Sequence, residues 1–176
     1  VSQPVSSAIS GWLVRRGFRE PLPPTTTGPG SHELRHRVLI LGCHRVASSL
    51  IPLLKATETD FLVVDFNPEA LATLRFQGVP CIYGDLTHQD SLERAGVAHA
   101  EILVSSVSDD FLRGTSNLVL LKQLRRLNPT AKIIVASERL ERARAMYDAG
   151  ADFVLLPRHL AAERLAGLIT EAGDGT

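Results

Sequence analysis

The chain has 176 residues, enough for one domain of ordinary size together with a tail. Its composition, 44% hydrophobic and 22% charged, excludes general disorder and a fibrous protein. Nineteen basic residues balance nineteen acidic ones, and this zero formal net charge argues against a dedicated nucleic-acid binder, which would show a basic excess. The two cysteines, Cys43 and Cys81, are far apart and support neither a disulfide framework nor a zinc site.

Residues 1–36 differ from the rest and are predicted to be a leader and linker. The mildly apolar stretch 5–14 is followed by three arginines within 15–19, a pattern typical of the cytoplasmic end of a membrane helix. A short amphipathic surface helix and a disordered leader are the alternatives. Residues 21–30 are rich in proline and glycine and are typical of a linker. Because the chain begins at Val1 rather than methionine, we expect it to be a piece of a longer protein.

From residue 37 onward, strands and helices are predicted to alternate strictly. The predicted strands are 38–42, 61–65, 79–83, 101–105, 132–136 and 153–156. The predicted helices are 48–55, 68–76, 87–95, one from Asp109 or Asp110 through Leu127, 139–149 and 160–169. Within this series, Thr87-x-x-Asp90 resembles a capping box at the start of its helix.

The strands are continuous apolar runs rather than alternating ones, so we expect them to be buried on both faces. Such strands belong to a parallel sheet with helices on each side. Six β–α units within residues 37–170 are too few for a closed eight-unit barrel. They predict an α/β fold with three layers: a doubly wound, Rossmann-like parallel sheet of about six strands, followed by a tail at 171–176.

The first predicted crossover carries a partial phosphate-binding motif. In an open parallel sheet, ligands bind at the carboxyl ends of the strands. The run Gly42-Cys43-His44-Arg45-Val46-Ala47 matches the first and third positions of G-x-G-x-x-G/A with Gly42 and Ala47. His44 takes the second position, where glycine normally lets the backbone approach a pyrophosphate, and it could either donate to a phosphate or plug the site. Arg45 is predicted to meet phosphate oxygens at the helix N-terminus. The alternative is a tight strand–helix turn without a ligand.

Asp65 ends the second predicted strand, 23 positions after Gly42. An acidic residue at this place accepts hydrogen bonds from the ribose of an adenosine. Phe66 and Asn67 follow, and no basic residue is there to accommodate a 2′-phosphate, so the pattern favours NAD, AMP, ADP or ATP over NADP. Asp65 could instead cap the next helix, but Asn67 lies nearer to that cap and would leave Asp65 free.

Polar residues also follow the third and fourth predicted strands. Asp85, within Gly84-Asp85-Leu86, could lie beside an adenine or bind backbone N–H groups at the next helix. Ser105 and Ser106 would border the nucleotide, although ordinary loop polarity explains two serines equally well. Cys43 beside a helix N-terminus could have a lowered pKa, and the alternative is a buried packing thiol.

The segment from Arg37 to Ile169, three-quarters of the chain, resembles the nucleotide-binding N-terminal domain known as RCK, KTN or TrkA-N. The matching pieces are Val38–Gly42 with Arg45, Val63–Asp65, Tyr83–Thr87, Asp90–Gly96, Ala100–Val104, Asn117, Asn128–Ile134, and Ala149–Val154 with Pro157. The Gly-Asp-x-Thr and Ala-Gly-Ala-Asp pieces are more specific than the glycine motif.

The resemblance implies a cytosolic gating domain on a potassium channel, a Trk/Ktr uptake system or a Kef-type cation:proton antiporter, and it favours an antiporter. Such domains bind NAD(H), AMP, ADP or ATP, pair through their last helices (here 160–169), and sit at the cytoplasmic face of the cell membrane. They are not enzymes, and nucleic acid is not among the partners implied. The residues implied in nucleotide binding are Gly42, His44, Arg45, Val46, Ala47, Asp65, Phe66, Asn67, Gly84, Asp85, Leu86, Ser105 and Ser106.

The sequence departs from the family pattern at three places. His44 replaces the central glycine, which favours a mononucleotide or a site without a ligand. An arginine common after the fifth strand is absent at Val135–Glu138, and the C-terminal ligand-binding subdomain does not follow before Thr176. A dimerisation module with a lapsed site is therefore one alternative. A small NAD-dependent oxidoreductase is another, although the sequence holds no Tyr-x-x-x-Lys pair.

Overall fold

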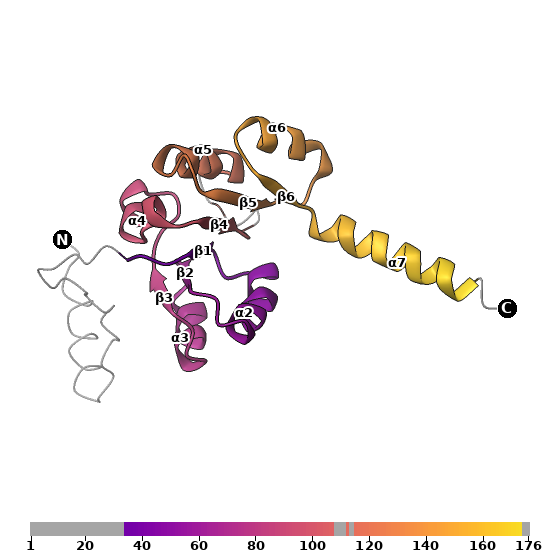
Figure 1. Cartoon of the computed structure of the whole chain (residues 1–176), viewed down its shortest axis with the longest axis horizontal. Coiled ribbons are helices and arrows are strands. Elements are labelled where there is room, and N and C mark those ends of the chain that lie inside the picture. The colour runs from indigo at the N-terminus through magenta and orange to yellow at the C-terminus, as the bar shows by residue number, and fades with distance from the viewer. Residues whose placement is uncertain (1–33, 108–111, 113–114, 174–176) are drawn as a thin grey trace, which may run out of the picture. The chain divides into compact units, whose positions relative to one another are not determined.

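The computed structural model describes residues 34–107, 112 and 115–173. The predicted leader therefore lies almost entirely outside the described residues, as do Asp109, Asp110 and the last three residues of the tail. Within the described part, strands and helices alternate along the chain (Figure 1).

Six strands form one parallel sheet. They are β1 (Val38–Leu41), β2 (Phe61–Asp65), β3 (Cys81–Tyr83), β4 (Ile102–Ser105), β5 (Lys132–Ala136) and β6 (Phe153–Leu155). Their order across the sheet is β3-β2-β1-β4-β5-β6, and every neighbouring pair is parallel. The order reverses between β1 and β4, so the switch point of the sheet lies beyond the carboxyl ends of these two strands. The predicted doubly wound, Rossmann-like fold is confirmed.

The helices cover both faces of the sheet (Figure 1). They are α2 (Val46–Ala56), α3 (Pro68–Phe76), α4 (Gln89–Arg94), α5 (Asn117–Leu127), α6 (Ala143–Asp148) and α7 (Pro157–Gly173), with 3-10 turns at Val97–His99 and Leu140–Arg142. Successive strand residues alternate between two buried clusters: Leu39 packs with α4, α5 and α6, whereas Ile40 packs with α2 and α3. Because β1, β2, β4 and β5 contribute to both clusters, their sequences are nearly continuous apolar runs, whereas β6 contributes only Val154.

Several predicted boundaries are wrong for local reasons. The helix α4 begins after His88, and the Thr87 hydroxyl donates to Asp85 instead of capping, so the predicted capping box does not form. The helix α5 begins at Asn117, and its cap is the Ser116 hydroxyl, which accepts from Val119 N. The predicted helix 139–149 is divided into a 3-10 turn and α6.

The start of β6 is held by a compact ionic cluster. Arg125 donates to the carbonyl of Gly150 at 2.7 Å and to the Asp152 carboxylate at 2.7 Å. The carboxylate also accepts from Ile133 N, at 2.9 Å. These contacts, led by the bond from Ile133 N, lower the pKa of Asp152 to about 2. The cluster joins α5, β5 and β6 at the end of the sheet opposite the ligand crevice.

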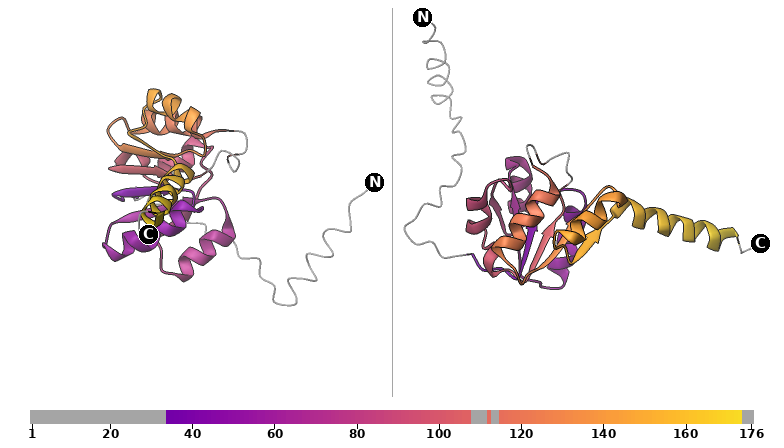
Figure 2. Two further views of the ribbon diagram at one scale, coloured as in Figure 1. Left: turned by 90° about the vertical axis from the view of Figure 1, so that its right-hand side faces the viewer. Right: turned by 90° about the horizontal axis from the view of Figure 1, so that it is seen from above.

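The last helix differs from the others in its surroundings. Figure 1 and Figure 2 both show α7 leaving the sheet beyond β6 and extending away from the other elements. Its apolar side chains are consequently exposed, from 44% at Leu168 to 71% at Ile169. The helix is longer than predicted at both ends: it begins at Pro157, two residues after the end of β6, and it continues to Gly173. Across the described residues, no helix combines the length and the apolar character needed to cross a membrane.

Candidate functional site

The turn after β1 is built around Gly42. Its φ is +83°, in the left-handed region that glycine adopts readily, and a Cβ at this position would overlap the buried side chain of Val107. The Gly42 carbonyl accepts from the Ser106 hydroxyl at 2.7 Å, and Gly42 N donates to the Val64 carbonyl at 2.8 Å. Arg45, also at positive φ (+34°), is the residue from which α2 begins. The glycine therefore allows the close approach of the β1 and β4 turns.

The Asp65 carboxylate joins two neighbouring turns. One oxygen accepts from Cys43 N at 2.6 Å and the other from Asn67 N at 2.7 Å. The residue is only 6% exposed. Asp65 does not cap α3, as expected, because Asn67 does so, but both of its carboxylate oxygens accept backbone N–H groups of the two turns. A carboxylate has about four acceptor positions, so these two bonds leave capacity for the hydroxyls of a ribose.

The other predicted residues on this side are held by local contacts. Asn67 caps α3 by accepting from Glu69 N at 2.9 Å, as its position in the sequence indicates. Asp85 accepts from Thr87 N at 2.9 Å, and this bond is the main reason why the pKa of Asp85 is lowered. Leu86 is buried in the core, whereas Phe66 is half-exposed. A Cβ on Gly84 would press against Val64.

The two serines after β4 have different environments. Ser105 is buried, and its hydroxyl donates to the Asn117 side chain at 2.9 Å. The Asn117 amide in turn donates to the Val107 carbonyl at 2.6 Å. These contacts join the end of β4 to the start of α5 and give Ser105 a structural role. Ser106 instead lies beside Gly42 on the crevice side.

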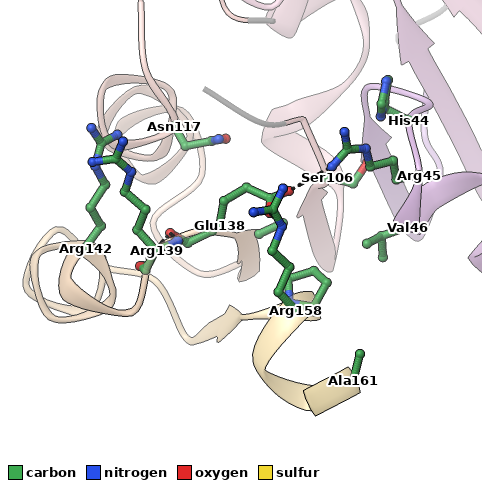
Figure 3. Close-up of a pocket in the computed structure, with 13 residues that line it drawn as sticks. His44, Arg45, Val46, Ser106, Asn117, Glu138, Arg139, Arg142, Arg158 and Ala161 are labelled. Atoms are coloured by element: carbon green, nitrogen blue, oxygen red, sulfur yellow. Dashed lines mark hydrogen bonds and ion pairs between the residues drawn. The ribbon is translucent and has the colours of Figure 1, made fainter. Parts of the chain in front are cut away.

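A cavity of about 480 Å³ opens at the switch point (Figure 3). Its lining comes from the turns after β1, β4 and β5, from the first residues of α2 and α5, from the 3-10 turn before α6, and from the start of α7. The lining residues are His44, Arg45, Val46, Ser106, Asn117, Ala136, Ser137, Glu138, Arg139, Arg142, Pro157, Arg158 and Ala161. We call this space the arginine cavity, after Arg45, Arg139, Arg142 and Arg158.

One carboxylate meets two of these arginines. Glu138 Oε2 lies 2.8 Å from Arg158 Nε, and Glu138 Oε1 lies 3.5 Å from a guanidinium nitrogen of Arg45. Figure 3 shows the two arginines reaching Glu138 from different elements. Glu138 Oε2 is buried without a well-aligned hydrogen bond, so its close approach to Arg158 is an ion pair rather than a directed bond. A concave site of this charge attracts anions.

Only some of the residues predicted to bind a nucleotide line the arginine cavity. His44, Arg45, Val46 and Ser106 line it, whereas the other predicted residues do not. Ala47 is fully buried in the core beneath the turn. The remaining predicted residues belong to the β1 turn itself, to the turns after β2 and β3, or, for Ser105, to the buried end of β4. The crevice therefore has a β1–β3 side with Asp65 and a separate arginine cavity.

Sequence reasoning missed the arginines beyond the fifth strand. The family arginine is absent at 135–138, but Arg139 is the very next residue and lines the cavity. Arg142 and Arg158 were not considered, although each follows the carboxyl end of a strand within a few residues, which is the signal that would have found them. Burial raises the pKa of the Cys43 thiol, which is opposite in direction to the lowered pKa considered from the sequence. No group of three metal-ligating side chains occurs among the described residues.

A parallel sheet in this order, with its crevice at the switch point, defines a doubly wound domain of the nucleotide-binding type. The TrkA-N domain family model matches residues 38–157. The chain therefore belongs to the TrkA-N domain family.

Two relatives are the glutathione-regulated potassium-efflux system proteins KefC of Escherichia coli O157:H7 and Cronobacter sakazakii. The first is 31% identical over 120 residues, covering 68% of this chain and 19% of KefC. The second is 32% identical over 118 residues, covering 67% and 18%. The chain thus spans about a fifth of the length of these relatives.

Solved structures show the same architecture. The TrkA-N domain of the inner membrane protein YbaL from Escherichia coli aligns with a TM-score of 0.69 at 20% identity, covering 77% of this chain and 98% of that one, and shows the fold alone. The GsuK channel bound to NAD aligns with a TM-score of 0.63 at 27% identity, covering 87% and 26%. GsuK bound to ADP aligns with a TM-score of 0.63 at 25% identity, covering 86% and 38%.

Proposed function

We propose that this chain is a regulatory domain of a potassium or other monovalent-cation transport protein. In this proposal it binds an adenine nucleotide, NAD(H), AMP, ADP or ATP, and thereby gates an attached channel or cation:proton antiporter, without being an enzyme. Support comes from the family, from the potassium-efflux relatives and from GsuK, whose structures hold NAD and ADP.

The observation that carries the proposal is that Asp65 and the arginine cavity lie on opposite sides of the same turn, the one after β1. Asp65 retains acceptor capacity for ribose hydroxyls next to the turn, and Arg45 at the start of α2 faces the cavity. An adenosine over β1–β3 would therefore place its phosphates toward the arginines. Opposite ends of one nucleotide need these two chemistries, a hydroxyl acceptor and a cationic clamp.

The partner side of the proposal rests on α7. Its exposed apolar residues, Leu160, Leu165, Leu168 and Ile169, are suited to pairing with the same helix of a second copy. A membrane-embedded channel or antiporter domain is the further partner, which would hold the domain at the cytoplasmic face of the membrane. Sedimentation of the chain beside a Leu168→Glu variant tests the homodimer. The proposal expects the parent chain to be a dimer and the variant to be a monomer.

Nucleotide binding is tested by thermal shift and titration calorimetry with AMP, ADP, ATP, NAD and NADH. A raised melting temperature with at least one of them is expected, since a ligand that binds only the folded state stabilises it. Arg45→Gln should weaken that binding. Arg144→Gln is the matched control, because Arg144 lies outside the cavity. The proposal fails if no nucleotide produces a shift at millimolar concentration.

A ligand-free structural module is a second candidate function. Two observations favour it: both oxygens of Asp65 already accept backbone N–H groups, and Glu138 already pairs with Arg45 and Arg158. The same thermal-shift series separates the candidates, because this module dimerises normally yet responds to none of the nucleotides.

A further inference from the structure

The helices α2 and α3, which cover the same face of the sheet, have outer surfaces with few charges (Figure 1). In its 11 residues α2 holds one charged side chain, Lys55, and its exposed positions include Pro52 and Leu53. The helix α5, of the same length on the other face, exposes Lys122 and Arg126. An outer helix that lacks the usual charged surface is one that another surface covers.

The most exposed large apolar side chains of this face lie near the carboxyl ends of the two helices. Phe76, the last residue of α3, is 94% exposed, and Leu53 of α2 is 65% exposed. The two helix ends are joined, because the Lys55 ammonium donates to the Gln77 carbonyl at 2.8 Å. Arg75 is exposed next to Phe76 in the sequence. We call Leu53, Lys55, Arg75 and Phe76 together the Phe76 patch.

The patch lies at the end of the sheet where the chain enters the domain. Between α2 and β2, the Asp60 carboxylate accepts from Arg37 N at 2.8 Å and lies 2.7 Å from His36 Nδ1. These two residues directly precede β1. The part of the chain that precedes Leu34 is therefore connected to the domain beside the carboxyl end of α2. The arginine cavity lies at the opposite end of the sheet.

We propose that the Phe76 patch is a membrane-contacting surface that binds the interface of a bilayer containing anionic phospholipids. Phe76 and Leu53 enter the boundary between headgroups and acyl chains, and Lys55 and Arg75 meet the lipid phosphates. The inference goes beyond the proposed function, because it assigns a lipid contact to the domain's own residues and does not depend on nucleotide binding.

The charges of the patch suit anionic headgroups. Lys55 uses one of its three donors on the Gln77 carbonyl, so two remain for phosphate oxygens. Against Lys55 and Arg75 stands one nearby acidic residue, Glu58, in the loop after α2. Asp60 is already held by the chain that enters the domain. An aromatic and an aliphatic side chain flanked by two cations is the composition found at membrane–water interfaces.

Site-specific fluorescence tests the contact, because Trp12 is the single tryptophan of the chain. The full chain carrying Trp12→Phe and Phe76→Trp is mixed with vesicles of phosphatidylglycerol and phosphatidylcholine, with and without brominated acyl chains. We expect its emission to shift to shorter wavelength and to be quenched by the brominated lipid. Trp12→Phe with Leu140→Trp is the matched control, since Leu140 is 60% exposed at the opposite end of the sheet. The proposal is overturned if the chain does not bind the vesicles, if position 76 stays unquenched, or if position 140 is quenched equally.

Co-sedimentation with the same vesicles measures what each side chain contributes. Phe76→Ser should weaken partitioning about tenfold, because the aromatic ring no longer enters the apolar boundary. Lys55→Gln should weaken it about fivefold on vesicles with phosphatidylglycerol and much less on phosphatidylcholine alone. Salt should reduce the contribution of Lys55. Leu140→Ser is the control and should partition like the parent chain. Equal partitioning of Phe76→Ser and Leu140→Ser contradicts the assignment.

Other occupants of the patch give different results. If a second copy of the chain covers it, the parent chain sediments without lipid as a larger assembly than Phe76→Ser does, and the lipid assignment is wrong. If no nucleotide stabilises the chain but position 76 is quenched, only the proposed regulatory function fails. If nucleotides bind and position 76 stays unquenched, only the lipid contact fails. Circular dichroism of each variant beside the parent chain shows whether a loss of binding reflects a loss of fold.

Discussion

The two sides of the crevice are constructed in contrasting ways. On the β1–β3 side, short backbone hydrogen bonds hold each carboxylate: Asp65 by Cys43 N and Asn67 N, and Asp85 by Thr87 N. In the arginine cavity, long and largely exposed guanidinium groups share one carboxylate, that of Glu138. The hydrogen bonds of the first side belong to the framework of the fold, so we expect them to stabilise it, whereas the ion pairs of the second side involve exposed side chains and should contribute little.

The sharpest test of this contrast is Asp65→Ala. The substitution leaves Cys43 N and Asn67 N without their acceptor in a buried place, and we expect a loss of about 4 kcal/mol in the free energy of unfolding. Urea denaturation measures it. Asp148→Ala is the control, because Asp148 is exposed at the end of α6. A loss no larger than that of the control would mean that the β1–β3 side is as adaptable as the cavity.

Gly42→Ala tests the turn that separates the two sides. An alanine there would need φ near +83° and would press against buried Val107, so we expect about 3 kcal/mol of destabilisation. Gly167→Ala is the matched control: no atom lies within 4 Å of a Cβ at this position inside α7. Alanine should raise stability there by about 0.5–1 kcal/mol. Thermal melts measure both variants. If the two melting temperatures shifted in the same direction, the proposed difference between the constrained Gly42 turn and the open Gly167 position would be refuted.

Acid pH tests the ionic cluster at the opposite end of the sheet. The pKa of Asp152 is lowered from its ordinary 3.8 to about 2, so the folded state favours the ionised form. The resulting stabilisation is complete above pH 4 and is lost as the pH falls from about 4 toward 2. Because the carboxylate is 30% exposed, we expect only about 1 kcal/mol. Asp152→Asn should reduce the slope of stability against pH in that window, and an unchanged slope would exclude Asp152 as its source.

The smallest effect on stability is expected for Glu138→Gln. Its ion pairs with Arg45 and Arg158 involve guanidinium groups that are 61% and 75% exposed, and such pairs contribute little. We expect a change within about 0.5 kcal/mol, measured by the same urea denaturation. A loss as large as that of Asp65→Ala would show that the cavity is part of the structural core, and would remove the contrast between the two sides.

The sequence was most informative where a feature depends on neighbouring residues. The apolar runs predicted the parallel sheet, and Asn67 was correctly associated with the cap of α3. Competition between nearby polar groups explains two errors in the predicted helix starts. Asp85 accepts the Thr87 hydroxyl that a capping box before α4 would use, and Ser116 rather than an earlier aspartate caps α5. The arginine cavity was largely missed because its lining comes from segments far apart in the chain, which only the order of the sheet brings together.

The junction between β6 and α7 has a mechanical consequence. Arg158 and Ala161, in the first turn of α7, form part of the cavity wall, while the rest of the 17-residue helix extends outward. At 1.5 Å of rise per residue, the helix is a lever arm about 25 Å long. A rotation of about 5° at its base would displace its far end by about 2 Å. A small rotation of the turn that holds Arg158 would therefore move the far end of α7 much further than it moves the cavity wall.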